Sequence, residues 1–500
     1  MKIENKKIRE LQARALQLRI DSIRSTTASA SGHPTTCLSA ADIISALFFE
    51  GMNFDLENPQ EKNNDRFILS KGHGIPVVYA AYKQLGVLSD EELMQLRQFE
   101  SPLEGHPTSR FIHNEAATGS LGQGLAIGAG MALQAKQDSF EYKTYVLLGD
   151  GELAEGSVWE AAAFASHESL NNLIGIVDCN RLGQSNQTLY GHDIDSIVKR
   201  FESFGWQVIS VDGHDIEQLL SALATAKQAK DKPVMIIAKT FKGYGVDEFE
   251  DKNGFHGKPV KKEELESVLA SLRERFAGVS LESLDTHASR ALGTSGNKVS
   301  SQNDKQKVAS SAPLVSSDLQ GKLYREISSA TTISIDLTQD PNHKFFASNQ
   351  TIATRKAFGY ALAALGRASK NIVALDADVK NSTYTDIFEK EFSERFIQCF
   401  IAEQTMVGVA TGLQVRGKIP FVATFGAFLT RAHDQIRMAG VGKNALRICG
   451  SHCGVSIGQD GPSQMALEDI AMMRSIPDSI VLYPSDGIST YKLTECMANC

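Results

Sequence analysis

One stretch of the chain, residues 145–185, constrains the fold more than any other. It reads YVLLGDGELAEGSVWEAAAFASHESLNNLIGIVDCNRLGQS. The apolar runs Tyr145–Leu148 and Leu173–Val177 are typical of buried strands, and apolar residues at helical spacing lie between them. Two strands joined by a helix form a parallel pair whose carboxyl ends lie at one edge of the sheet. The sequence therefore predicts an α/β fold that brings Asp150 and Asn180 to the same edge.

These two side chains indicate a site for a divalent ion. Carboxylate and amide oxygens are hard ligands that suit Mg²⁺ or Ca²⁺, and such an ion takes further oxygens, typically from a phosphate. Gly149 and Gly151 flank Asp150 and allow the backbone to approach that phosphate closely. Two tight turns in an ordinary α/β domain are the alternative interpretation.

The segments GDGELAEGSVWEA and NRLGQS resemble the diphosphate motif of thiamine diphosphate enzymes, and of transketolases in particular. The resemblance implies that Asp150, Asn180 and the backbone carbonyl of Leu182 hold Mg²⁺ (or Ca²⁺ or Mn²⁺), with Gly151 beside the diphosphate of the cofactor. It also implies a fold of two thiamine-diphosphate-binding-type domains, each with a parallel sheet flanked by helices.

The composition excludes several classes of protein. With 500 residues, 42% hydrophobic and 22% charged, the chain is typical of a soluble globular protein of about two to four domains. A net charge of −8 argues against nucleic acid or an anionic membrane as the main partner. The seven cysteines lack a CxxC pair, and the charged N-terminus has no apolar leader, so we expect a cytoplasmic protein with reduced thiols.

Three histidines stand beside glycine in predicted turns: His33 in SGHP, His73 in LSKGH and His106 in GHP. Each alone is more often structural, but together they indicate neutral imidazoles that exchange protons and hydrogen bonds with a polyol. A zinc site is the alternative, and the lack of an HxxxH pair weakens it. The resemblance implies that these histidines face the sugar and the cofactor diphosphate.

Two further segments of the first half carry candidate residues. Gly119, Ser120 and Leu121 open a helix of small residues, and the resemblance places them in the cofactor cleft. Lys239 and His256 lie at a strand end and in the following loop, which could simply be solvated. The resemblance implies that both reach the cofactor or substrate, with His256 at the donor sugar.

A change of composition divides the chain. Residues 281 to about 320 are rich in Ser, Ala, Asn and Lys and lack aromatics, which is typical of a linker. We therefore predict a diphosphate-binding domain at 1–280, a linker at 281–350 and a pyrimidine-binding domain at 351–500. Compared with transketolases, the chain stops before the next strand and the C-terminal domain, so we expect an incomplete second domain and a fragment of a longer protein.

In the second half, Glu403 follows a predicted strand, Arg395–Phe400, and precedes an apolar helix. A carboxyl in such a place is poorly solvated and can share its proton with a basic nitrogen. A glutamate that caps the helix dipole is an equally good interpretation of the residues alone. The match of AEQ to transketolases implies that Glu403 hydrogen-bonds the aminopyrimidine ring of the cofactor and activates it.

The remaining assignments come from the resemblance. Phe425 and Phe428, which could equally be core residues, would sandwich the aminopyrimidine ring. Asp378 would also lie at the cofactor. His452, Asp460 and Gln464 would contact the sugar, and Arg355 and Ser382 would bind the phosphate of the acceptor.

The resemblance implies transfer of a two-carbon ketol unit from a ketose phosphate such as xylulose 5-phosphate to ribose 5-phosphate or erythrose 4-phosphate, in the pentose phosphate pathway. The catalytic residues would be Glu403, His33, His106, His256 and His452, in a homodimer with shared active sites. Two alternatives are another enzyme of the superfamily, such as 1-deoxyxylulose-5-phosphate synthase, and a truncated chain that binds cofactor or a partner subunit without catalysis.

Overall fold

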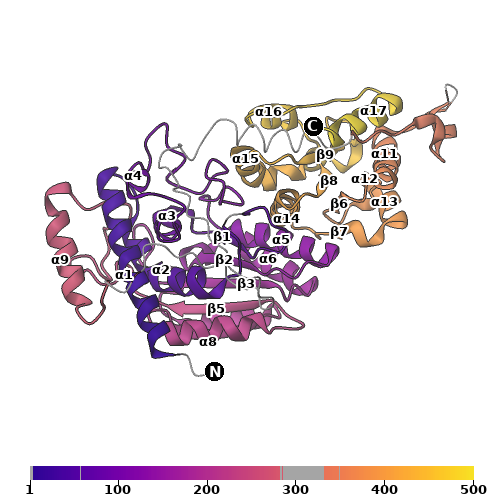
Figure 1. The fold of residues 1–500 in the computed structure, drawn as a ribbon. Helices are drawn as coiled ribbons and strands as arrows, with labels where there is room; N and C mark the ends of the chain where they lie inside the picture. The colour runs from indigo at the N-terminus through magenta and orange to yellow at the C-terminus, as the bar shows by residue number, and fades with distance from the viewer. Residues whose placement is uncertain (1–3, 57, 282–283, 285–331, 348–349) are drawn as a thin grey trace, which may run out of the picture.

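The computed structural model describes residues 4–56, 58–281, 284, 332–347 and 350–500. Two parallel β-sheets flanked by helices lie side by side, and helices α5 and α14 meet between them (Figure 1). This architecture confirms the fold class predicted from the sequence. In the described residues, no helix combines the length and the apolar character needed to cross a bilayer.

The first sheet has the strand order β1-β2-β3-β5-β4, and every pair in it is parallel. Its strands are β1 (Arg66–Leu69), β2 (Thr144–Gly149), β3 (Leu173–Cys179), β4 (Gln207–Asp212) and β5 (Val234–Lys239). The register pairs Thr144 with Leu173 and Gly149 with Asp178. Asp150 and Asn180 each follow the last residue of a neighbouring strand, so both lie at the carboxyl edge, as predicted.

Alternate residues of these strands point to opposite faces, and helices cover both. Val146 and Val177 pack with α5 (Gly124–Asp138), α6 (Gly156–His167) and α7 (Ile194–Ser203), whereas Tyr145 and Ile176 pack with the helices of the other face. That second group comprises α1 (Asn5–Ala28), α2 (Pro34–Ala46), α3 (Ile75–Gln84) and α8 (Ile216–Lys227). The short α4 (Asp90–Leu93) and the peripheral α9 (Leu265–Arg275) complete this domain. A sheet buried on both faces explains its nearly continuous apolar strands.

The second sheet has the order β7-β6-β8-β9 and is also parallel. Its strands are β6 (Ile372–Asp376), β7 (Phe396–Gln398), β8 (Ile419–Phe425) and β9 (Arg447–Ser451). The helices are α11 (Thr354–Ala368), α12 (Lys380–Thr383), α13 (Asp386–Glu391), α14 (Glu403–Val415), α15 (His433–Val441), α16 (Asp469–Arg474) and α17 (Gly487–Ala498). The carboxyl ends of these strands carry the candidate residues of the second half, as in the first sheet.

Part of the predicted linker packs on the second domain, and the rest lies outside the described residues. Asp340 is buried, and its Oδ2 accepts hydrogen bonds from Arg367 Nη2 at 2.8 Å and from the Tyr491 hydroxyl at 3.0 Å. Ile335 and Phe346 pack into the adjoining apolar cluster. Residues 332–347 therefore form a strap across α11 and α17.

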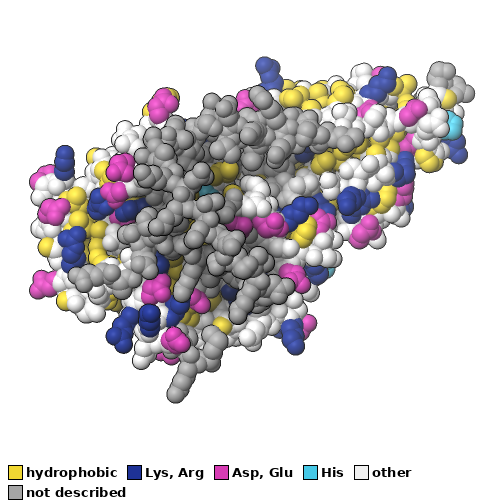
Figure 2. All heavy atoms as spheres, in the orientation of Figure 1, with side chains coloured by type: hydrophobic (Ala, Val, Ile, Leu, Met, Phe, Trp, Pro, Cys, Tyr) yellow, Lys and Arg dark blue, Asp and Glu magenta, His cyan; other side chains and the backbone are white. Residues whose placement is uncertain are grey.

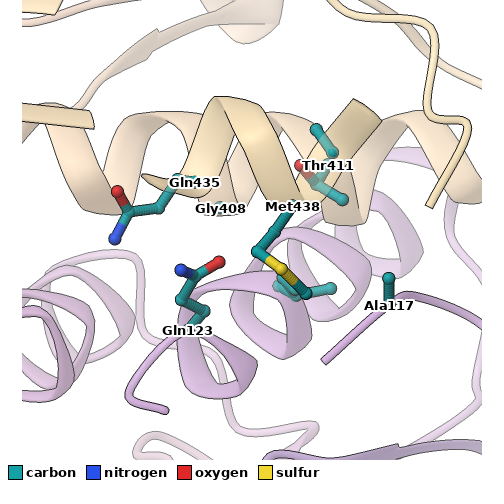
Figure 3. Close-up of a pocket in the computed structure, with 8 residues that line it drawn as sticks. Ala117, Gln123, Gly408, Thr411, Gln435 and Met438 are labelled. Atoms are coloured by element: carbon teal, nitrogen blue, oxygen red, sulfur yellow. The ribbon is translucent and has the colours of Figure 1, made fainter. Parts of the chain in front are cut away.

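The two domains share one apolar core through the contact between α5 and α14. Glycines allow this close approach, because a Cβ at Gly130 would overlap the carbonyl of Val409, and one at Gly412 would overlap the carbonyl of Ile127. Figure 3 shows the same interface at the start of α5, where Gln123 faces Gln435 around a cavity of only about 10 Å³. The interface is close-packed, which fixes α14 relative to the first sheet.

Gly412→Ala should destabilise this interface, because the new methyl group has no space between α14 and α5. Overpacking of this kind costs about 1–3 kcal/mol of unfolding free energy, and urea unfolding followed by circular dichroism would measure it. The matched control is Gly278→Ala, where a Cβ would meet nothing within 4 Å. Equal stability of the two variants would show that the helices do not depend on this close contact.

Candidate active site

The three predicted ion ligands lie together at the carboxyl edge of the first sheet. Asp150 Oδ2 accepts hydrogen bonds from the backbone N–H of Arg181 at 2.7 Å and from Thr188 Oγ1 at 3.0 Å. The backbone N–H of Leu182 donates to Asn180 Oδ1 at 3.3 Å. The loop that follows β3 therefore folds back onto the Asp150 carboxylate.

The chemistry of this corner fits a divalent cation. Asp150 is 3% exposed, and burial, followed by the nearby charge of Asp178, raises its pKa to about 7. No salt bridge reaches Asp150 from the described residues, whereas the Leu182 carbonyl already accepts a hydrogen bond from the Lys242 ammonium at 2.7 Å. A cation would relieve the buried carboxylate, and the remaining ligands would come from phosphate or water oxygens.

No group of three or more His, Cys, Asp or Glu side chains in the described part of the chain could hold a metal ion. The corner offers instead one carboxylate, one amide and one backbone carbonyl. Such an all-oxygen set suits Mg²⁺ or Ca²⁺ rather than zinc, which prefers nitrogen and sulfur ligands.

Asp178, at the end of β3, fixes the orientation of Asn180. Its fully buried carboxylate forms an ion pair with Lys71 and accepts hydrogen bonds from Ser39 Oγ at 2.6 Å and from the Thr240 hydroxyl. Asn180 Nδ2 also donates to it, at 3.2 Å. With its amide nitrogen directed to Asp178, Asn180 turns its oxygen toward the Leu182 loop, where it accepts the Leu182 N–H and has a second lone pair for an ion.

The predicted histidines meet in one cluster beside this corner. The ring centroid of His33 lies 5.1 Å from that of His73, 6.3 Å from that of His106 and 4.9 Å from that of His256. Lys242 Nζ lies 2.9 Å from His256 Nδ1. Four segments that are far apart in the sequence thus deliver imidazoles and an ammonium to one place.

These imidazoles are neutral at physiological pH. Burial, then the charge of His256, lowers the pKa of His33 to about 3. Burial, then Lys242, lowers the pKa of His256 to about 4, and burial with Lys71 lowers the pKa of His73 well below its ordinary value. Burial, then Arg97, lowers the pKa of His106. Neutral rings can both donate and accept a hydrogen bond.

The turn at Gly119–Leu121 lies against the same cluster. Gly119 has a φ of +132°, and a Cβ there would lie 2.8 Å from the His106 ring. Ser120 donates a hydrogen bond to Asp434 of the second domain, and Leu121 is 38% exposed. The glycine is required both for the backbone conformation and for the contact with His106.

Three cationic residues of the site were missed by the sequence analysis: Lys71, Lys242 and Arg97. Lys239, the predicted contact, is exposed, whereas Lys242 is buried three residues later. Arg97 links two of the histidine turns, since it donates to Ser31 Oγ at 2.9 Å and to the Gly105 carbonyl at 3.4 Å. Lys71 and Lys242 stand in glycine-containing segments, LSKGH and TFKGYG, which could have indicated that they belong to the site. No such pattern surrounds Arg97 in the sequence.

In the second domain, Glu403 is the first residue of α14 and is 3% exposed. Its Oε1 accepts a hydrogen bond from Arg431 Nη1 at 2.9 Å, a partner that the sequence did not indicate. Two residues later, Thr405 Oγ1 donates to Glu160 Oε2 of the first domain at 3.2 Å. The start of α14 is therefore held by both domains.

Phe425 and Phe428 stack on each other, with ring centroids 5.0 Å apart and an interplanar angle of 4°. The ring centroid of His452 lies 4.1 Å from that of Phe425. A pyrimidine between the two phenylalanines would require them to separate, whereas one packed against an outer face would not.

The predicted substrate residues of this domain fall into two groups. Arg355 Nη1 donates to the Ser382 carbonyl at 2.9 Å, which brings the proposed phosphate ligands together. Burial, then the charge of Arg355, lowers the pKa of His452, and Asp460 opposes this shift. The side-chain amide of Gln464, another predicted substrate residue, donates to the neighbouring Ser463 at 3.4 Å. Asp378, predicted as a cofactor residue, is exposed and has a φ of +64°.

The candidate residues of the two domains are not bonded to each other in the described part of the chain, although Ser120 bonds Asp434 of the second domain. Among the described residues, no hydrogen bond, ion pair or ring contact joins the first-domain histidines to Glu403, Phe425 or His452. Each domain therefore presents its own half of a site at the carboxyl edge of its sheet.

Comparisons with known proteins identify the family of the chain. The transketolase thiamine diphosphate binding domain matches residues 10–284, and the transketolase pyrimidine binding domain matches residues 350–500. Transketolase from Homo sapiens is 47% identical over 500 residues, which are 100% of this chain and 74% of that protein. Transketolase-like protein 2 from Bos taurus is 46% identical over 494 residues, or 98% of this chain and 73% of that protein.

Solved structures show the same fold. Transketolase from Campylobacter jejuni superposes with a TM-score of 0.82 at 28% identity, and covers 100% of this chain and 77% of that chain. Transketolase from Leishmania mexicana gives 0.77 at 26% identity, with 97% and 75% covered. The chain therefore belongs to the transketolase family, and it is a thiamine diphosphate-binding transferase that moves a ketol unit between sugar phosphates.

Proposed function

We propose that the ion corner anchors the cofactor in this reaction. Asp150, Asn180 and the carbonyl of Leu182 would hold Mg²⁺, or Ca²⁺ or Mn²⁺ in its place, and its charge would anchor the cofactor diphosphate beside Gly151. The observation that carries the proposal is the buried Asp150 carboxylate, which has no salt-bridge partner among the described residues and lies beside neutral histidines. His73, Lys239 and the turn Gly119-Ser120-Leu121 complete the cofactor contacts of the first domain.

Thiamine diphosphate, when bound, supplies an electron sink for the carbon from which the ketol unit is transferred. Glu403, which is buried at the start of α14, would hydrogen-bond the aminopyrimidine ring and share a proton with it. Phe425 and Phe428 offer an aromatic face to that ring, with Asp378 nearby. The hydrogen bond from Arg431 to the Glu403 carboxylate must be shared with the ring or broken when the ring binds.

The remaining residues bind the sugars. His33, His106 and His256 give and take protons at the donor hydroxyl groups, because neutral imidazoles serve both as donors and as acceptors. His452, Asp460 and Gln464 hold further hydroxyl groups, and Arg355 with Ser382 receives the acceptor phosphate. The proposed substrates are xylulose 5-phosphate with ribose 5-phosphate or erythrose 4-phosphate, in the pentose phosphate pathway.

We further propose a homodimer in which each site takes one half from each chain. Two observations support it. In the described part of the chain no hydrogen bond, ion pair or ring contact joins the two half-sites, and large apolar side chains are exposed along residues 467–488, from α16 to α17 (Figure 2). The exposed group includes Leu467, Ile470, Ile480, Tyr483 and Ile488. Exposed apolar patches of this kind mark interaction surfaces.

The domain limits that we propose are 1–280 for the diphosphate-binding domain, 281–350 for the linker and 351–500 for the pyrimidine-binding domain. We also propose a cytoplasmic location. Support comes from the cysteines, all seven of which are free, as expected in a reducing compartment.

The ion corner is tested by cofactor retention and turnover. The purified chain with Mg²⁺ should transfer a ketol unit from xylulose 5-phosphate to ribose 5-phosphate. Asp150→Ala should weaken metal-dependent retention of thiamine diphosphate by more than about 100-fold, because loss of a direct metal ligand costs more than loss of a residue that only orients a ligand. Retention after gel filtration would be measured by thiochrome fluorescence. The exposed Asp195→Ala is the matched control. Wild-type retention by Asp150→Ala would refute the ion assignment.

Glu403→Gln tests the proton role. An amide is isosteric but cannot share a proton as a carboxyl does, so exchange of the cofactor C2 hydrogen should slow by about 10²–10⁴-fold while cofactor affinity falls less. Quenched deuterium exchange read by NMR would measure the rate. Glu394→Gln, an exposed substitution in the same domain, should leave it unchanged. Undiminished exchange in Glu403→Gln would remove this residue from the mechanism.

The histidine cluster predicts acid sensitivity. Because the pKa of His33 is lowered to about 3 in the folded protein, the unfolded chain binds the extra proton, and stability falls as the pH drops from 6.5 toward 3. His33→Gln should therefore lose less unfolding free energy than the parent between pH 7 and pH 5, as measured by urea titration. The exposed His167→Gln should behave like the parent. Identical pH profiles for all three would contradict the burial of a neutral imidazole.

A further inference from the structure

Glu152 is a buried carboxylate that the proposed chemistry does not use. It follows Gly149-Asp150-Gly151 and is 1% exposed. In the described part of the chain, no cationic side chain forms a salt bridge with it. A buried carboxylate without an ion-pair partner needs hydrogen bonds to offset its desolvation, so its donors reveal what it does.

Three donors surround it. Oε1 accepts from the backbone N–H of Gly149 at 2.7 Å. Oε2 accepts from the backbone N–H of Gly122 at 2.8 Å and from Ser70 Oγ at 2.5 Å. Ser70 Oγ in turn accepts from the backbone N–H of Gly124 at 3.2 Å, which leaves its own hydrogen for Glu152. Both carboxylate oxygens therefore act only as acceptors.

The donors belong to three separate segments of the site. Gly149 precedes Asp150, Ser70 lies in the LSKGH segment three residues before His73, and Gly122 follows the turn at Gly119–Leu121. These segments touch directly, because a Cβ at Gly72 would lie 2.9 Å from the backbone nitrogen of Gly119. Backbone bonds from Ser70 and Lys71 to the Leu147 carbonyl tie the end of β1 to β2. The Glu152 carboxylate is the group that bonds to all three segments at once.

We propose that Glu152 is a positioning residue that holds these three loops in the arrangement that receives the cofactor diphosphate. The proposal rests on the assignment of Asp150 and of Gly119–Leu121 to cofactor binding. Glu152 acts through backbone groups and through Ser70, without touching the cofactor. Because its partners lie at the edge of the sheet rather than in the core, its loss should affect cofactor binding before it affects the fold.

The first test is Glu152→Gln. Either orientation of the amide places an NH₂ group against an N–H or O–H donor, so at least one of the three loops loses its bond. The concentration of thiamine diphosphate for half-saturation, with Mg²⁺ present, should rise about 10–100-fold, as for other groups that orient ligands. The kcat at saturating cofactor should change by less than about threefold, because no catalytic group is removed.

A second readout does not involve the cofactor. In the apo protein, hydrogen exchange followed by mass spectrometry should show faster exchange in peptides that contain Gly122 and Gly149, while peptides of β4 and α8 stay unchanged. This measurement distinguishes the loop-positioning role of Glu152 from the ion site at Asp150. Faster exchange together with Asp150→Ala retention at the wild-type level would refute the ion corner and leave the loop tether standing.

Two further variants keep the proposal falsifiable if Glu152→Gln does not fold. Ser70→Ala removes one donor and leaves both backbone bonds, so cofactor affinity should fall by about 2–10-fold, the range for one hydrogen bond. Glu202→Gln, on the exposed face of α7, is the matched control and should behave like the parent.

Unchanged cofactor affinity in folded Glu152→Gln or in Ser70→Ala would overturn the proposal. An equal loss of kcat and affinity, with a lower apo melting temperature, would also overturn it, since this result indicates a general role in stability. A selective loss of affinity with faster exchange in both loops would support it.

Discussion

The buried ion pair between Lys71 and Asp178 underlies the whole carboxyl edge of the first sheet. Both side chains are almost fully inaccessible, and the pair joins the end of β1 to the end of β3. Asp178 also bonds Ser39 of α2 and Thr240 after β5. Removing one member would leave an unpaired buried charge, at a cost of about 3–5 kcal/mol. The ion corner and the histidine cluster are both built on this pair.

The same arrangement determines the charge of the site. Asp178 balances Lys71, so Lys242 and Arg97 remain as positive charges around the histidines. Burial and these cations keep the imidazoles neutral, as the pKa of His33 near 3 shows. The net charge of the chain is −8, so attraction for an anionic cofactor and sugar phosphates comes from this local cluster rather than from the whole molecule.

The sequence predicted those features that depend on local patterns. The ends of the two apolar strand runs placed Asp150 and Asn180 at the carboxyl edge of the sheet, and the glycine–histidine turns indicated a cluster that the structure brings together. Features that depend on tertiary contacts were not predictable in this way. Lys71 and Asp178 are 107 residues apart, so no local pattern connects them. Likewise, the exposure of Lys239 and the burial of Lys242 depend on how the loop after β5 folds over the site.

Helix α5 contacts elements of both half-sites. The loops at its N-terminus are tied to Glu152 and Ser70, which lie beside the ion corner. Its middle packs without free space against α14, whose first residue is Glu403. A close-packed contact of this kind leaves little room for α14 to shift relative to α5. The glycines of this contact are therefore part of the active-site architecture, because they set how closely α5 and α14, and with them the two domains, approach each other.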